Sequence, residues 1–95
     1  MRNISAELLI RECRVVRAGF IEVVVWALPK PLSGSPHGFK YRLAFVVDNA
    51  CVLRYDNEAG KGDHRHVGTQ ETPYVFSSVD QLLEDFMTDV VRWKG

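Results

Sequence analysis

Hydrophobic residues recur along this chain with two different spacings, and each spacing predicts one kind of secondary structure. Across residues 6–56, β-branched and aromatic residues alternate with polar residues or form short apolar runs, which is typical of strands. Across residues 78–94, apolar residues instead recur every three or four positions, which is typical of an amphipathic helix. The pattern therefore predicts several strands followed by one helix.

Turn residues divide the first part of the chain into separate strands. The segment FIEVVVWAL at 20–28 gives the strongest strand signal, because it is β-branched and aromatic and carries only the charge of Glu22. Ala18-Gly19 precedes it and predicts a hairpin turn, and three prolines within 29–38 predict a loop. We predict strands at 6–17, 20–28, 39–48 and 51–56, a polar solvent-facing loop at 57–66, and a short edge strand near 74–76.

The last segment carries an apolar stripe and a clear helix start. Ser78 and Gln81 fit a capping box, in which each side chain binds a free backbone N–H near the helix start. The stripe consists of Val79, Leu82, Leu83, Phe86, Met87, Val90 and Val91. Its only large apolar partner is the predicted sheet. We therefore expect an α+β fold in a single domain, residues 1–95: an antiparallel sheet of four to five strands with one long C-terminal helix, 78–94, packed across one face.

Charge is balanced over the whole chain but unevenly distributed along it. Twelve lysines and arginines match twelve aspartates and glutamates, yet residues 1–66 carry a net charge of +3 and residues 67–95 carry −3. Lys30, Lys40 and Arg42 lie between Val23 and Val47, where there is no acidic residue. A neutral chain is not expected to coat nucleic acid through charge alone, but it can hold one or two phosphates in a small basic site.

The sequence also bears on where the protein works. The longest apolar run, Val23 to Leu28, has six residues, and a membrane-spanning helix needs about 20. The N-terminal residues do not have the pattern of a signal peptide. Cys13 and Cys51 lack a CxxC spacing and fall in strand-like segments, so we expect free buried thiols. These observations favour a cytoplasmic protein without cofactor or metal.

The segment 55–66 contains the candidate chemistry, because it combines two histidines with cations, carboxylates and glycines. In extended backbone, His64 and His66 point to the same side, roughly 6.6 Å apart. This separation suits a base and an acid that flank one phosphate. We expect Lys61 and Arg65 to hold the phosphate charge, and one of the nearby carboxylates to orient an imidazole. These carboxylates are Asp56, Glu58 and Asp63, and Lys40 and Arg42 add to the basic side of the site.

Two other interpretations of this segment stay open. It could be a polar loop without chemistry, or His64 and His66 could bind a metal ion together with a carboxylate. His37 lies between Pro36 and Gly38 and is expected to be a surface residue that could join the site. We expect Trp26 to serve mainly in packing.

Several strings along the chain resemble those of a known family. YDNEAGKGDHRH at 55–66, followed by ETPYVF at 71–76 and VDQL at 79–82, resembles the TumE family of toxin–antitoxin toxins. EVVVWALPKP at 22–31 and HGFKYRL at 37–43 support the resemblance. Only the first turn departs from the family, with Arg-Ala-Gly in place of a more usual Asp-Gly.

The resemblance implies a toxin encoded beside an antitoxin, often a helix-turn-helix DNA-binding protein. It also implies a functional set: Tyr55, Asp56, Asn57, Glu58, Lys61, Asp63, His64, Arg65 and His66. We expect RNA as the target and a metal-independent endoribonuclease as the activity. A nucleotide- or tRNA-modifying transferase and a non-enzymatic partner-binding protein are the alternatives, and a homo-oligomer is left open.

Overall fold

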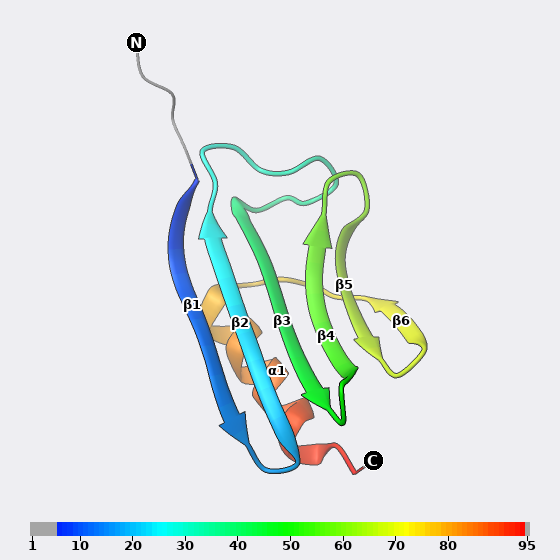
Figure 1. Ribbon diagram of the computed structural model, residues 1–95. Coiled ribbons are helices and arrows are strands. Elements are labelled where there is room, and N and C mark those ends of the chain that lie inside the picture. Colours follow the sequence, from blue (N-terminus) through cyan, green and yellow to red (C-terminus); the bar gives the residue numbers. More distant parts are fainter. Residues whose placement is uncertain (1–5, 95) are drawn as a thin grey trace.

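The structure is a six-stranded antiparallel sheet with one helix across one face (Figure 1). The computed structural model describes residues 6–94. The strands lie side by side in chain order, so each pairs with its neighbours in the sequence. They are β1 (Glu7–Val16), β2 (Gly19–Ala27), β3 (Phe39–Val47), β4 (Ala50–Glu58), β5 (Gly62–Val67) and β6 (Gln70–Pro73), and the helix is α1 (Val79–Arg92).

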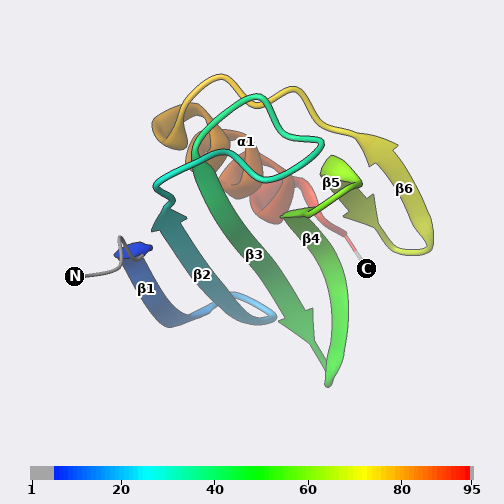
Figure 2. The ribbon, with the colours of Figure 1, turned by 90° about the horizontal axis from the view of Figure 1, so that it is seen from above.

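The core lies between the helix and the central strands, and Figure 2 shows α1 lying over one face of the sheet. Leu82 and Phe86 of the helix are fully buried there, as the apolar stripe predicts. Alternate residues of the strands point toward them, namely Ile21, Val23, Val25, Tyr41, Leu43, Phe45, Leu53 and Tyr55. On the opposite side of the sheet, which we call the open face, no helix formed by residues 6–94 lies over the strands.

The α+β class and the helix across one face are confirmed, but the prediction of four to five strands was wrong. The segment 57–66 is not a solvent-facing loop. It completes β4, turns at residues 59–61 and forms most of β5. The last strand, β6, precedes the predicted position at 74–76 and ends at Pro73, whose ring cannot donate to a ladder. Glycines and charged residues concealed this hairpin, because the strand pattern rests on apolar alternation.

The helix start agrees with the prediction in one half of the capping box. The Ser78 side chain accepts a hydrogen bond from the backbone N–H of Gln81 at 3.0 Å. The Gln81 side chain does not return the bond as predicted, because it donates to Asp85 one turn later at 2.8 Å. No helix within residues 6–94 is long and apolar enough to cross a membrane.

The cysteines are free, as predicted, but the prediction that they are buried was wrong. Cys13 lies on the edge strand β1, and Cys51 lies at the start of β4, and both are exposed. The edge position leaves Cys13 without a neighbouring strand on one side. Strand alternation gives the face of a residue but not whether another element covers that face.

Two distant loops meet at one end of the sheet (Figure 1). The backbone N–H of Gly60, in the β4–β5 turn, donates to the carbonyl of Ser33 in the β2–β3 loop at 2.6 Å. Gly34 and Gly62 pack so closely that a Cβ atom on Gly62 would lie 3.0 Å from the carbonyl oxygen of Gly34. Both have positive φ, which glycine adopts at little cost. The glycines of the GKG sequence therefore attach this turn to the β2–β3 loop.

Candidate functional site

Successive side chains of β4 and β5 point to opposite faces of the sheet, and this alternation divides the candidate residues between the two faces. The β4–β5 register pairs Arg54 with His66 and Asp56 with His64, and these four residues lie on the open face. The residues between them point toward the helix, in the pairs Tyr55–Arg65 and Asn57–Asp63. The segment thus forms two separate groups of polar residues.

The two histidines lie side by side on β5, as the sequence predicts. Their ring centroids are 6.5 Å apart, and about a fifth of each side chain is exposed. His64 Nε2 donates to the backbone carbonyl of Lys61 at 2.7 Å, which fixes its ring against the β4–β5 turn. Because each side chain is partly exposed, both rings can be reached from the open face.

A carboxylate oxygen of Glu71 lies between the two rings. Glu71 Oε2 is 3.2 Å from His64 Nδ1 and 3.7 Å from His66 Nε2. The contact with His64 Nδ1 is not aligned as a hydrogen bond, and this nitrogen is buried without a hydrogen-bond partner. Because Glu71 lies on the edge strand β6 and is about half exposed, its side chain has room to move away.

Arg54 and Asp56 lie against His66. Arg54 Nη2 is 3.1 Å from His66 Nε2, and Arg54 Nε is 3.1 Å from Asp56 Oδ2. Arg54 Nη2 also lies 3.5 Å from His66 Nδ1, and because a guanidinium can only donate, whichever ring nitrogen binds it must accept through a lone pair. We call Arg54, Asp56, His64, His66 and Glu71 the histidine cluster.

The side of the sheet that faces the helix holds a second, buried group around Asp63. The Asp63 carboxylate accepts hydrogen bonds from Ser35 Oγ at 2.8 Å, from Tyr41 Oη at 2.7 Å and from His37 Nε2 at 2.6 Å. The other ring nitrogen of His37 accepts the backbone N–H of Phe39 at 3.2 Å. Burial and the bond to Asp63 raise the pKa of Tyr41 well above its ordinary value, so this hydroxyl stays a donor.

Asn57 connects this group to β3 and has no exposed surface. Its side-chain oxygen accepts the backbone N–H of Tyr41 at 3.0 Å, and its amide donates to the carbonyl of Phe39 at 2.7 Å. The Lys40 ammonium donates to the backbone carbonyl of Asn57. We call Ser35, His37, Tyr41, Asn57 and Asp63 the buried lock, because they hold the β2–β3 loop, β3 and the β4–β5 hairpin together.

Arg65 also points toward the helix, where it forms a third polar group. Its Nε donates to Asp89 of α1 at 2.7 Å and to the Tyr55 hydroxyl at 3.1 Å. The Tyr55 hydroxyl donates to the same Asp89 oxygen at 2.5 Å. Burial alone would raise the pKa of Asp89, but the bonds from Arg65 and Tyr55 outweigh it and hold this pKa below its ordinary value. Asp89 raises the pKa of Arg65 further, so this pair is charged at neutral pH.

The structure therefore brings some predicted site residues together and separates others. His64, His66 and Asp56 meet in the histidine cluster, and Lys40 and Arg42 lie on the same open face on β3. Arg42 pairs with Glu22 at 3.6 Å. Lys61 and Glu58 are exposed near the β4–β5 turn, 3.7 Å from each other. Tyr55, Asn57, Asp63 and Arg65 belong to the opposite face.

Sequence reasoning missed several participants. Arg54 and Glu71 enter the histidine cluster from β4 and β6, and only the hairpin register shows that they face the histidines. The expectation that His37 is a surface residue was wrong, because only 11% of its side chain is exposed. Its ring stacks on Phe76 with centroids 3.9 Å apart.

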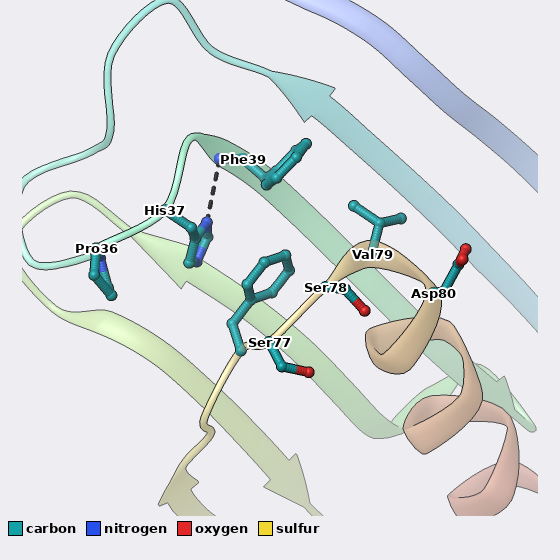
Figure 3. A pocket seen from close by; sticks show the side chains of 8 residues that line it. Pro36, His37, Phe39, Ser77, Ser78, Val79 and Asp80 are labelled. Carbon is teal, nitrogen blue, oxygen red and sulfur yellow. Dashed lines mark hydrogen bonds between the residues drawn. The ribbon is translucent and has the colours of Figure 1, made fainter.

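An open pocket lies next to His37, and Figure 3 shows residues that line it. Phe39, Phe76 and Val79 supply apolar surface, and Ser77, Ser78 and Asp80 close it at the start of α1. Both ring nitrogens of His37 already have partners, so its imidazole is not free to transfer a proton here. Within residues 6–94, no group of three or more histidines, cysteines and acids is arranged to hold a metal ion.

Comparison with known proteins identifies the family. A family model described as Toxin TumE matches residues 4–94, nearly the whole chain. No curated protein and no solved structure matches the chain. The resemblance carried by the YDNEAGKGDHRH string is thereby confirmed, and the chain belongs to the Toxin TumE family.

Proposed function

We propose that this toxin cleaves RNA without a metal ion and that His64 and His66 act as its acid–base pair. The observation that supports this most directly is the position of Glu71 Oε2 between the two imidazoles. An anionic oxygen fits at this point, and a phosphate oxygen has the same charge and a similar size. We infer that the scissile phosphate takes the place of the Glu71 carboxylate.

The neighbours of each ring support a different role for each histidine. His66 Nε2 is the ring nitrogen nearer the Arg54 guanidinium, and in the tautomer in which it accepts from Arg54 it has a lone pair that can take the proton of a ribose 2′-hydroxyl. His64 is held through Nε2 by the Lys61 carbonyl, so its Nδ1 points toward the Glu71 position. In the imidazolium form, which carries a proton on both ring nitrogens, Nδ1 can give a proton. In this reaction the 2′-oxygen binds phosphorus as the bond from phosphorus to the 5′-oxygen breaks. His64 protonates the leaving oxygen, and the products are a 2′,3′-cyclic phosphate and a 5′-hydroxyl.

Cations on the open face would hold the RNA backbone. Arg54 touches His66, and a turn of its guanidinium would bring its fork of donors to the phosphate. Arg42 and Lys40 lie across the neighbouring strand, and Trp26 pairs with Lys40 and offers a ring on which a base can stack. In this proposal Arg65 supports β5 through Asp89, while Arg54 takes the role at the phosphate.

A toxin family implies an antitoxin partner, which we expect to be a helix-turn-helix DNA-binding protein. The proposed site of action is RNA in the cytoplasm. Partner binding through the open face without catalysis, and transfer of a group to a nucleotide or tRNA, are the two alternatives that the experiment must separate.

The test is incubation of the purified toxin with a short end-labelled RNA in excess EDTA. Cleavage fragments that carry 2′,3′-cyclic phosphate and 5′-hydroxyl ends would support the proposal. RNA that stays intact until a divalent metal is restored would contradict the metal-independent reaction. In a parallel reaction supplied with nucleoside triphosphates and a divalent metal as group donor, full-length RNA of increased mass would instead show a transferase, and unchanged RNA in both reactions would leave partner binding as the function.

A further inference from the structure

The two edges of the sheet differ in how well they are protected from pairing with another chain. The β6 edge is four residues long and ends at Pro73. Short strands and prolines are usual protections of exposed edges. The β1 edge is ten residues long and contains no proline, and in the part of the chain that the structure describes it pairs only with β2. Its one irregularity lies between Leu8 and Ile10, which leaves Ile10–Val16 as a regular free edge.

The turn that follows β1 determines which backbone groups are free. Val16 and Gly19 pair across a two-residue turn, and the residues that close such a turn exchange both of their hydrogen bonds. Along β1 the backbone N–H and C=O groups therefore point alternately toward β2, as at Val16, and away from β2, as at Val15. By this alternation Arg11, Cys13 and Val15 direct their N–H and C=O groups outward.

The side chains of β1 select one register for antiparallel pairing with a second copy. A two-fold axis at Glu12 would place two carboxylates opposite each other, and an axis at Arg11 or Arg14 would oppose two guanidinium groups. When the axis passes through Cys13, Glu12 of each copy lies opposite Arg14 of the other copy, which gives two such pairs. The same register places Ile10 opposite Val16 of the second copy, also twice. Oppositely charged and apolar cross-strand pairs both stabilise a sheet.

We propose that β1 is a homodimer interface, in which two copies of this chain pair antiparallel about Cys13 and join their sheets into one of twelve strands. Glu12 and Arg14 are now 3.8 Å apart on the same strand and about half exposed, so both are available for pairing across the axis. Val15, 85% exposed, lies opposite Arg11 of the second copy, whose aliphatic stem can cover it. The two-fold axis is perpendicular to the sheet, so both open faces lie on the same side.

The first test reverses the charges of the two proposed Glu12–Arg14 pairs. Light scattering coupled to gel filtration should give twice the monomer mass for the wild-type protein. Glu12→Arg and Arg14→Glu each create two like-charged pairs and should halve the mass. The double variant E12R/R14E restores two opposite pairs and should restore the dimer. Circular dichroism checks that each variant is folded. A monomeric wild type, or a double variant that stays monomeric, would overturn the proposal.

The second test uses Cys13, which lies on the proposed axis. A hydrogen-bonded antiparallel pair has Cα atoms about 5.5 Å apart, within the range of disulfides. With glutathione disulfide as oxidant, two Cys13 thiols would give up two protons and two electrons and form one bond, and the oxidant would become two glutathione thiols. Cys51→Ser should keep this crosslinked dimer, and Cys13→Ser should lose it. Glutathione adducts of monomers alone, or crosslinking that requires Cys51, would overturn the register.

Discussion

Asp63 and His64 are neighbours in the sequence but serve opposite sides of the sheet. Asp63 accepts three side-chain hydrogen bonds in the buried lock, whereas His64 lies beside His66 on the open face. The same short string therefore contains residues for stability and residues for the proposed chemistry. The two sets can be separated by mutation because their side chains do not share a face.

Asp63→Ala is expected to lower the free energy of unfolding by about 3 kcal/mol, because it leaves Ser35, His37 and Tyr41 without their acceptor. For a domain of this size that corresponds to a fall in Tm of roughly 15 °C. Asp63→Asn keeps one acceptor oxygen and should lose less. His64→Ala should cost only about 1 kcal/mol, because His64 is partly exposed. Thermal unfolding followed by circular dichroism measures all three, and equal losses for Asp63→Ala and His64→Ala would contradict the division of the faces.

The two glycines of the β4–β5 turn form a matched pair for testing the contact between the loops. Both have φ near +80°, so alanine at either position strains the backbone by about 1 kcal/mol. Only at Gly62 would the new Cβ also meet the carbonyl oxygen of Gly34, at 3.0 Å, whereas Gly60 has open space. Gly62→Ala should therefore destabilise the fold more than Gly60→Ala in urea unfolding. The reverse order would mean that the two loops do not pack as described.

The polar group formed by Arg65, Tyr55 and Asp89 predicts that the stability of the fold depends on pH. Its hydrogen bonds keep the pKa of Asp89 in the folded state below its unfolded value of about 4. A depressed pKa gives stabilisation that is complete above the unfolded pKa and is lost as pH falls through the folded pKa. Asp89→Asn should therefore cost about 1–2 kcal/mol at neutral pH, with a difference from wild type that shrinks below about pH 4.

Urea unfolding of wild type and Asp89→Asn at several pH values measures this difference. Glu84, an exposed acid on the same helix, provides the control, and Glu84→Gln should change stability little at any pH. A difference for Asp89→Asn that stays constant down to pH 2 would contradict the assignment of the depressed pKa to this carboxyl.

Removing the charge of Glu71 tests whether the carboxylate occupies the phosphate position. Glu71→Gln takes away an anion that lies against both imidazoles. It should tighten RNA binding about fivefold, as expected for an ion pair of about 1 kcal/mol at a partly exposed site. Fluorescence anisotropy with a labelled RNA measures the affinity. Glu58→Gln removes the same charge near the turn and should change the affinity less. Weaker binding by Glu71→Gln would show that Glu71 supports RNA binding and does not compete with it.

The sequence predicted the parts of the fold that depend on apolar periodicity. The stripe containing Leu82 and Phe86 identified the helix and its buried face, and the FIEVVVWAL run identified β2. The strand at 51–56 was predicted, but the segment 57–66, which completes β4 and forms most of β5, escaped this reasoning because its inward residues are polar. Asn57 and Asp63 are buried through hydrogen bonds and not through hydrophobicity, so no alternation of apolar residues marks them.

From the sequence, only the residues that share a face of the single strand β5 could be placed together in the candidate site. His64 and His66 share a face because side chains alternate along any strand, and this required no knowledge of the neighbours. The same alternation places Arg65, which lies between the two histidines, on the opposite face, although the prediction included it in their site. On that face the Arg65 side chain pairs with Asp89 of the helix. Arg54 and Glu71 depend on the register across three strands, which the sequence alone does not give.

We propose that the paired histidines of the open face carry out RNA cleavage. The most direct measurement is the single-turnover cleavage rate of His64→Ala and His66→Ala on a defined RNA in excess EDTA, with each variant shown to be folded. We predict that each variant loses at least about 100-fold in rate, because removing a general acid or base typically costs 10²–10⁴-fold. Wild-type rates in both folded variants would contradict the claim.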